Sequence, residues 1–273
     1  MTDKTKAKKY YGQNFLTNKA VPERIVRESG VTSSHGVLEI GPGRGILTEF
    51  LALIAKKVVA VEIDSELIPF LWEKFSGFEN VEIAEGDILK TDIQKLIDEH
   101  FTGMPLSVCA NIPYYITSPI ILKLIAGNYS FDTVTVMVQK EVARRLCAKK
   151  KSSEYSSLTV LCDYYATVKK LFDVPAGNFL PKPKVDSAVI RFDIRKAPPV
   201  SPKDIDLFFR VIRLGFSHRR KTLVNCLVSS DFPFSKDEIL IALALSGFSS
   251  NIRGEEMDIY DFEKFVSGLY KFK

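Results

Sequence analysis

The chain has 273 residues, of which 46% are hydrophobic and 26% are charged, and its formal net charge is +5. This composition is typical of globular proteins and excludes disordered and fibrous classes. Its apolar runs, such as 37–40 and 58–63, have strand length and fall far short of the roughly 20 residues that span a bilayer. The Lys-rich N-terminus lacks the apolar core of a secretory signal, so we expect a cytoplasmic protein with no membrane segment.

Between residues 37 and 194, β-rich runs alternate with stretches that have the periodicity of amphipathic helices. We predict strands at 37–40, 58–63, 81–84, 106–110 and 133–138. We predict helices at 46–55, 66–75, 93–100 and 119–126. The runs 158–168 and 187–194 favour a closing antiparallel hairpin with a long loop. This alternation predicts an α/β fold with a mostly parallel, doubly wound sheet.

The segment 196–203 contains Pro198, Pro199 and Pro202, so neither a helix nor a central strand can run through it. We therefore expect an α/β domain at 1–197 and a small helical domain at 198–273. The helices of the second domain are predicted at 204–214, 221–228, 236–246 and 261–270.

Three alternating glycines, Gly41, Gly43 and Gly45, follow the first predicted strand and precede a helix. Glycines in this position let a chain turn sharply beneath a ligand, although a tight structural turn uses the same residues. Glu62 ends the next strand and can accept hydrogen bonds from ribose hydroxyls. Asp87 follows the third strand, where it can bind an adenine amine or stand as a solvated turn residue.

The glycine spacing differs from that of the dinucleotide fingerprint, which leaves two residues before its third glycine. Gly-x-Gly-x-Gly preceded by an acidic residue resembles instead the first motif of class I methyltransferases. That resemblance implies S-adenosylmethionine, which has no phosphate to hold, as the cofactor.

The sequence Asn111-Ile112-Pro113-Tyr114 follows the fourth predicted strand, at the edge where an open α/β sheet binds ligands. The Asn111 side-chain oxygen and the Ile112 carbonyl can accept the two hydrogens of a planar amine. Pro113 biases Ile112 away from helical geometry, and Tyr114 offers a ring for an extruded base. These residues predict a catalytic loop for amine methylation, and an Asn-Pro turn beside a core tyrosine is the structural alternative.

No metal site is predicted. The three histidines form no cluster, and the four cysteines lack the paired spacing of zinc sites or disulfide frameworks. We expect these cysteines to be free thiols: Cys109, Cys147, Cys162 and Cys226.

Basic residues gather near Arg144 and Arg145, at 149–151 and at 218–221. A mildly basic net charge only weakly indicates nucleic acid, and each run taken alone also fits a solvated surface.

Four further segments, together with the motifs above, resemble the KsgA family of ribosomal RNA adenine dimethyltransferases. They are 12–16 (GQNFL), 139–143 (QKEVA), 179–187 (FLPKPKVDS) and 215–223 (GFSHRRKTL). The resemblance covers nearly the whole chain. It implies a class I Rossmann-like methyltransferase with a mostly parallel seven-stranded sheet and a small C-terminal all-helical domain. The implied reaction dimethylates the N6 amines of two adjacent adenines in the 3′-terminal hairpin of small-subunit ribosomal RNA, within an immature subunit during ribosome biogenesis.

The same resemblance assigns further residues. It adds cofactor contacts at Gln13, Asn14, Leu16, Ile63 and Ile88, and it places Phe179 against the target base opposite Tyr114. RNA contacts are expected at Arg144, Arg145, Arg219, Arg220 and Lys221, whose charges can neutralise phosphates. We expect a monomer.

Two alternatives stay open. Erm enzymes, which methylate large-subunit RNA, usually carry Ile where Ile112 stands and the KsgA family commonly carries Leu, although only the backbone carbonyl is needed there. The loop 115–119 and the basic motif favour the small-subunit enzymes. A non-catalytic RNA-binding assembly or transcription factor on the same fold would predict erosion of the glycine loop, Asn111 or Tyr114, and all of these are intact.

Overall fold

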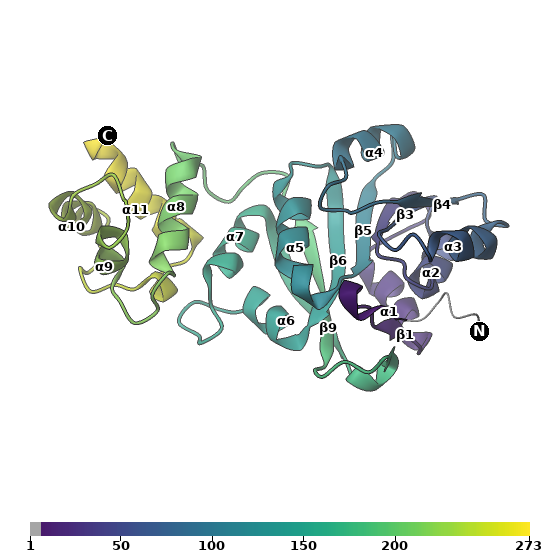
Figure 1. Cartoon of the computed structure of the whole chain (residues 1–273). Helices are drawn as coiled ribbons and strands as arrows, with labels where there is room; N and C mark the ends of the chain where they lie inside the picture. The colour runs from purple at the N-terminus through teal and green to yellow at the C-terminus, as the bar shows by residue number, and fades with distance from the viewer. Residues whose placement is uncertain (1–6) are drawn as a thin grey trace. The chain divides into compact units, whose positions relative to one another are not determined.

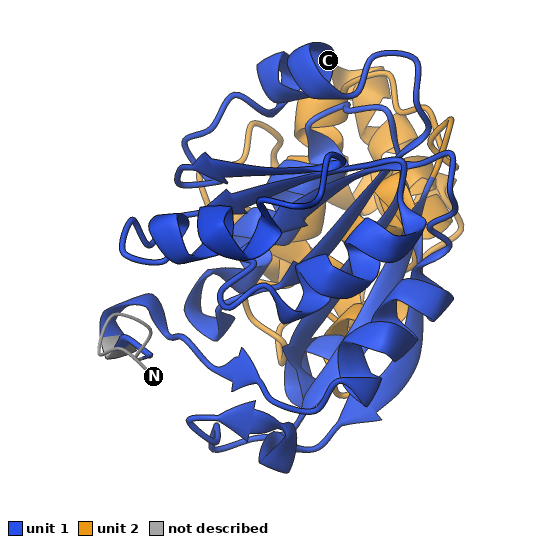
Figure 2. Ribbon diagram, turned by 90° about the vertical axis from the view of Figure 1, so that its right-hand side faces the viewer, with its two compact units in different colours: residues 1–143, 167–194 blue, residues 144–166, 195–273 orange. Residues whose placement is uncertain are grey.

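The computed structural model describes residues 7–273, which form two compact units. The first unit runs to residue 143 and resumes at 167–194, and the second comprises 144–166 and 195–273 (Figure 2). The chain therefore passes between the units three times, after residues 143, 166 and 194.

The first unit is built on a seven-stranded sheet with the order β4-β3-β2-β5-β6-β9-β7 (Figure 1). The strands are β2 (Gly36–Ile40), β3 (Lys57–Glu62), β4 (Val81–Glu85), β5 (Leu106–Asn111), β6 (Phe131–Gln139), β7 (Ala166–Val174) and β9 (Ser187–Ile194). Neighbouring strands from β4 to β6 are parallel, and β9 runs antiparallel to β6. The predicted mostly parallel seven-stranded sheet is confirmed.

Helices cover both faces of this sheet. They are α1 (Ala20–Ser29), α2 (Ile46–Ile54), α3 (Ile68–Phe75), α4 (Ile93–His100), α5 (Thr117–Ala126) and α6 (Lys140–Leu146). Ile25 of α1 and Leu51 of α2 share a buried cluster with Cys109 and Met137 of the sheet. Figure 1 shows α5 on the opposite side. A separate two-stranded sheet pairs β1 (Phe15–Leu16) with β8 (Phe179–Leu180).

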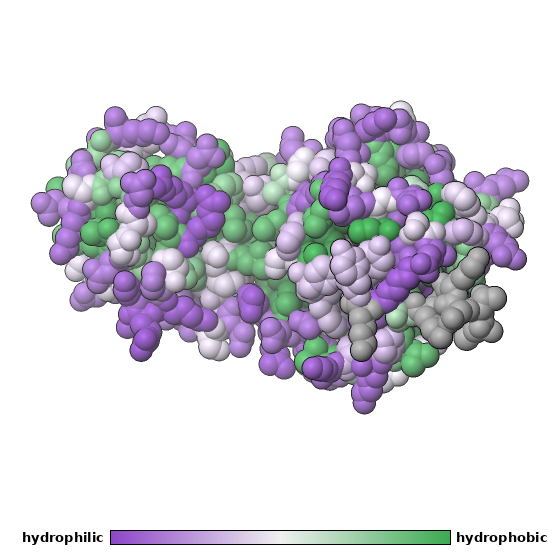
Figure 3. Space-filling view, in the orientation of Figure 1, coloured by the Kyte–Doolittle hydropathy of each residue, from purple (hydrophilic) through white to green (hydrophobic). Residues whose placement is uncertain are grey.

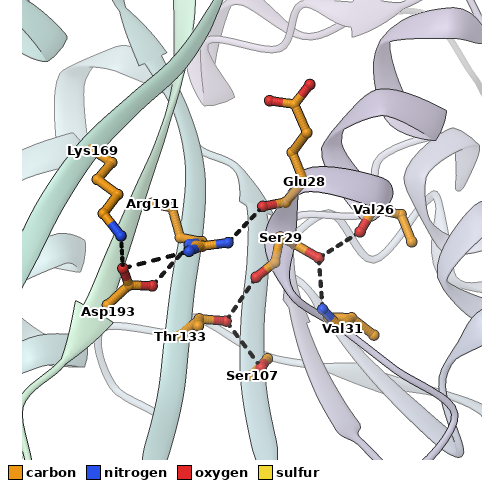
Figure 4. A network of polar contacts seen from close by, with 9 residues as sticks. All are labelled: Val26, Glu28, Ser29, Val31, Ser107, Thr133, Lys169, Arg191 and Asp193. Carbon is orange, nitrogen blue, oxygen red and sulfur yellow. Dashed lines mark hydrogen bonds and ion pairs between the residues drawn. The ribbon is translucent and has the colours of Figure 1, made fainter.

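A polar network fastens the C-terminal end of α1 to the sheet (Figure 4). Arg191 of β9 donates from Nη1 to the Glu28 carbonyl oxygen at 2.9 Å, and it forms an ion pair with Asp193 at 2.8 Å. The Thr133 hydroxyl of β6 lies 3.1 Å from the Ser29 carbonyl oxygen. These bonds satisfy backbone carbonyls at the end of α1, which have no partner within the helix. They fix α1 against the strands that follow it much later in the chain.

The second unit is helical. Its helices are α7 (Ser157–Tyr165), α8 (Ile205–Gly215), α9 (Leu223–Val228), α10 (Lys236–Leu245) and α11 (Ile259–Leu269). Tyr155 and Val160 share a buried core with Phe208 and Phe262. The Tyr155 hydroxyl donates to the Met257 carbonyl oxygen at 3.1 Å. The segment 144–166 is thus part of the helical core.

The structure departs from the sequence expectations in this region. The strand expected at 158–168 is wrong, because 157–165 forms α7 and the strand β7 follows it at 166–174. The β-branched and aromatic residues of 158–168 favour a strand locally, but packing against the helical core decides the conformation. The compact units also differ from the expected division at 197/198, since 144–166 belongs with the C-terminal helices. Helices α1 and α6 were not expected. Within 7–273, no helix is long and apolar enough to cross a membrane.

Candidate active site

A pocket opens where the carboxyl ends of β2, β3, β4 and β5 meet, within the first unit. In open α/β sheets ligands bind at this edge, where the strand order reverses, here between β2 and β5. The pocket holds about 1050 Å³ of empty space, counting its open mouth, which suits a ligand of nucleoside size. Among residues 7–273, no cluster of His, Cys, Asp and Glu could hold a metal ion.

The structure brings most of the predicted site residues together around this pocket. They are Gln13, Asn14, Leu16, Gly41, Gly43, Glu62, Ile63, Asp87, Ile88, Asn111, Ile112, Pro113 and Tyr114. Gly45 and Phe179 are not among the residues that line it.

Glu62 is the acidic residue predicted at the end of β3, and backbone amides hold both of its carboxylate oxygens. Oε2 accepts from the Gly43 amide and Oε1 from the Asp64 amide, each at 2.9 Å. Burial raises the pKa of Glu62, and these hydrogen bonds oppose that increase. The turn of the glycine loop needs φ +59° at Gly43, a conformation that favours glycine. Each oxygen retains a lone pair for a ribose hydroxyl.

Glu39 lies in β2 two residues before Gly41, and it is 1% exposed at the pocket wall. Its Oε2 has no hydrogen-bond partner within the described part of the chain, and burial raises its pKa to about 8. The free protein therefore holds Glu39 mostly protonated at neutral pH, and a cationic ligand beside it would favour the ionised form. The acidic residue before the glycine loop was the sequence signal for this position, but burial depends on the tertiary fold.

Asp64 is a residue of the site that sequence reasoning missed. It accepts from Lys8 Nζ at 2.7 Å and from Gln13 Nε2 at 2.9 Å, and its side chain is 2% exposed. Burial opposes ionisation, but these hydrogen bonds hold the pKa of Asp64 below its usual value. The side chain of Gln13, which lines the pocket, is therefore held by Asp64.

Asn111 is the last residue of β5, and its side chain points toward the N-terminal segment. Its Nδ2 donates to the Asn14 carbonyl oxygen at 3.4 Å. With the amide nitrogen engaged there, Oδ1 can accept a hydrogen bond from a ligand amine. Pro113 continues in an extended conformation, φ −56° and ψ 134°, so the backbone leaves the strand before the turn at Tyr114–Ile116.

Tyr114 is held by its hydroxyl, which lies 2.7 Å from the Ser187 Oγ of β9. Burial raises the pKa of Tyr114, so the phenol stays neutral at physiological pH. Its ring lines the pocket beside Asn111. Ser187, which fixes the ring, lies in the segment 179–187 that resembles a family motif.

Gly45 and Phe179 pack against core side chains. A Cβ at Gly45 would lie 2.6 Å from the Phe75 ring, so a side chain there would collide with α3. Phe179 is 4% exposed, pairs with Leu16 in the β1–β8 sheet and belongs to the core beneath α1 and α2. Among residues 7–273, no ring contact joins Phe179 to Tyr114.

The basic residues predicted for RNA lie in the second unit, where two distant runs meet around Glu255. Arg219 forms an ion pair with Glu255 at 3.5 Å, and the Lys151 amide donates to the Glu255 carbonyl oxygen at 2.8 Å. We call 149–151 and 219–221 together the basic surface, and all six residues are exposed. Figure 3 shows hydrophilic residues along the lower edge of this unit, below α8. Arg144 and Arg145 lie in the last turn of α6.

The comparisons with known proteins agree with this geometry. The family model for ribosomal RNA adenine dimethylase matches residues 4–241. The chain belongs to the ribosomal RNA adenine dimethylase family. It is an S-adenosylmethionine-dependent methyltransferase with the Rossmann-like fold of that family.

Individual relatives and solved structures are similar to most of the chain. The ribosomal RNA small subunit methyltransferase A of Bacillus licheniformis is 45% identical over 93% of this chain and 88% of its own length. Among solved structures, a dimethyladenosine transferase from Plasmodium falciparum has a TM-score of 0.79 and 31% identity, and the similarity covers 94% of this chain and 98% of that one. The 23S rRNA methyltransferase ErmE has a TM-score of 0.71 and 27% identity, covering 94% of this chain and all of ErmE.

Glu39 makes the folding stability of the ligand-free enzyme depend on pH. Its pKa is 4.5 when unperturbed and about 8 in the folded protein, so between these values the folded state binds more protons than the unfolded state. Stability then falls as pH rises through this window. We expect the melting temperature of Glu39→Gln, relative to wild type, to rise from pH 5 to pH 8, measured by thermal unfolding without ligand.

The exposed residue Glu79 provides the matched control. Glu79→Gln should show a difference from wild type that does not change with pH. A pH-independent difference for Glu39→Gln as well would contradict the assignment.

Proposed function

We propose that this enzyme methylates the N6 amines of two adjacent adenines in the 3′-terminal hairpin of small-subunit ribosomal RNA, adding two methyl groups to each. The observation that carries the proposal is that the Asn111–Tyr114 loop opens onto the same pocket as Glu62 and Asp87. The 45% identity to a small subunit methyltransferase A supports the choice of RNA. An immature small subunit as the partner, a monomeric enzyme and a cytoplasmic location belong to the same proposal.

The pocket fits S-adenosylmethionine. The Glu62 carboxylate, held by the Gly43 and Asp64 amides, is set to bind the ribose hydroxyls. Ile63 and Ile88 provide apolar walls for the adenine ring, and Asp87 can accept from its amine. The buried, unpartnered Glu39 oxygen favours a ligand that carries positive charge. When bound, S-adenosylmethionine supplies a methyl group activated by a sulfonium.

Asn111 and Ile112 prepare the target amine. Its lone pair is delocalised into the adenine ring, so it must become more tetrahedral before it can attack. The Asn111 Oδ1 and the Ile112 carbonyl oxygen accept its two hydrogens and stabilise the positive charge that develops on nitrogen. With S-adenosylmethionine bound in the pocket, the nitrogen lone pair held by Asn111 and Ile112 would take the methyl group, the sulfur would leave as a neutral thioether, and the excess proton would pass to water.

Tyr114 provides a fixed ring on which the extruded adenine stacks, since the Ser187 hydroxyl holds its phenol. Phe179 completes the sandwich in this proposal. Because its ring is buried beneath α1 and α2, that contact requires a rearrangement of the β1–β8 pair.

The basic surface binds RNA phosphates without reading sequence. Arg220 and Lys221 present exposed cations next to Arg219, and Lys149–Lys151 extend the same region across Glu255. Arg144 and Arg145 add charge to the same unit. We propose residues 198–273, with the segment 144–166 that packs among them, as the RNA-engaging domain.

The decisive test of the substrate uses radiolabelled S-adenosylmethionine with unmethylated small subunits and, separately, with large-subunit RNA. We expect label only in small-subunit RNA, on adenines of the 3′-terminal hairpin, mapped by primer extension. Label confined to large-subunit RNA would establish an Erm-type enzyme instead. No label in either RNA would point to a non-catalytic binding factor.

Asn111→Ala tests the catalytic loop. Removing one group that stabilises the transition state should lower single-turnover methyl transfer by roughly two to three orders of magnitude. The rate is measured with saturating cofactor and RNA, so that altered binding does not contribute. Tyr114→Phe is the companion variant: it keeps the stacking ring and loses only the hydrogen bond to Ser187, so it should lose less activity than Asn111→Ala. Near-normal turnover of Asn111→Ala refutes its role.

The double variant Arg219→Ala/Arg220→Ala tests the basic surface. It should weaken RNA binding and reduce the slope of log affinity against log salt by roughly one per lost phosphate contact. Lys236→Ala/Lys271→Ala removes two exposed charges of the same unit outside the basic surface and should leave the slope nearly unchanged. Equal slopes for the wild type and the arginine variant would show that RNA binds at another surface.

A further inference from the structure

Three tyrosines besides Tyr114 lie in or next to the active-site pocket. Tyr11 and Tyr115 both line the pocket. The rings of Tyr10 and Tyr11 lie 5.1 Å apart in an edge-to-face arrangement. Tyr10 and Tyr115 are 86% and 62% exposed. Large rings left this open beside a site are a feature of binding surfaces.

Tyr115 is held from one side by the N-terminal segment. A Cβ at Gly12 would lie 3.3 Å from the Tyr115 ring atoms Cδ1 and Cε1, so the Gly12 backbone passes close to that ring. The next residue, Gln13, is anchored to Asp64. This segment therefore supports the ring while most of the ring stays open to solvent.

The two consecutive tyrosines have different environments. Tyr114 is tied to Ser187 and partly buried in the pocket. Tyr115 has no described hydrogen bond within residues 7–273, and burial and its neighbours Tyr10, Asp87 and Tyr11 raise its pKa. The neutral exposed ring is suited to stacking, because every nucleobase presents a π-face.

We propose that Tyr115, with Tyr10 and Tyr11 beside it, is a stacking platform for the base next to the target adenine. This inference rests on the proposed function, since it requires a base extruded into the pocket at Tyr114. When one base of a single strand leaves the stack, its neighbour loses a stacking partner on that side. Tyr115, one residue along the chain from Tyr114, replaces that partner at the pocket mouth.

The test compares two hairpin RNAs, one intact and one abasic at the position flanking the target adenine. With the intact RNA, Tyr115→Ala should raise the KM for RNA by roughly 5- to 150-fold, the range for loss of one stacked base. The KM for S-adenosylmethionine should not change. With the abasic RNA, wild type and Tyr115→Ala should have the same KM, because the stacking partner is already gone.

Two variants serve as controls. Tyr115→Phe keeps the ring and should behave like wild type. Tyr260→Ala removes a tyrosine that is 60% exposed in the helical unit and should leave both KM values unchanged. An equal KM increase for Tyr115→Ala on both RNAs, or an increased KM for S-adenosylmethionine, would overturn the platform and leave a structural or cofactor-binding role.

A binding measurement separates this inference from the proposed function. In an RNA with 2-aminopurine at the flanking position, wild type and Tyr115→Phe should quench its fluorescence and Tyr115→Ala should not. Quenching that persists in Tyr115→Ala refutes the platform. The readout needs no methyl transfer, so a failure of catalysis and a failure of stacking are distinguished.

Discussion

The site depends on one buried carboxylate held by two backbone amides. Glu62 accepts from Gly43 in the loop after β2 and from Asp64 in the turn after β3. A carboxylate in an apolar surrounding is costly unless such donors surround it. Because the donors are backbone groups, the two turns must keep a fixed separation. The Glu62 carboxylate thereby fixes the two turns that shape this part of the pocket. It also lines the pocket itself.

The same constraint extends by hydrogen bonds to the catalytic loop. Asp64, placed by Glu62, holds Lys8 and Gln13, and Asn14 follows Gln13 directly. The Asn14 carbonyl then accepts from the Asn111 side chain. The residue proposed to bind ribose and the residue proposed to receive the target amine therefore belong to one connected network. A substitution in the N-terminal segment can therefore disturb both the surroundings of Glu62 and the position of Asn111.

The sequence was sufficient to predict the parts of this fold that follow from chain-wide rules. Glu62, Asp87 and Asn111 each end a parallel strand or follow one, and such ends share one edge of a sheet. The helix at 157–165 could not be predicted, because its β-prone residues become helical only against the core around Phe208. Phe179 shows the same limit, since its motif indicates a function but not which side its ring faces.

Local sequence patterns also could not predict which distant segments come together in the fold. The runs 149–151 and 219–221 meet because the backbone at Gly254 packs directly on that at Gly215, where a Cβ would lie 2.4 Å from the Gly215 carbonyl oxygen. Each glycine looks ordinary in sequence. Their contact places Glu255 between the two basic runs, so the surface exists only in the folded unit.

The divided helical unit also has a consequence for synthesis of the chain on the ribosome. Tyr155 and Val160 must bury their side chains against Phe208 and Phe262, and the last of these partners is translated about 100 residues later, roughly 5 to 20 s at typical elongation rates. Throughout that interval α7 has no completed core to join. The nascent chain thus carries an exposed apolar segment in its middle, where a chaperone can bind it until the C-terminus emerges.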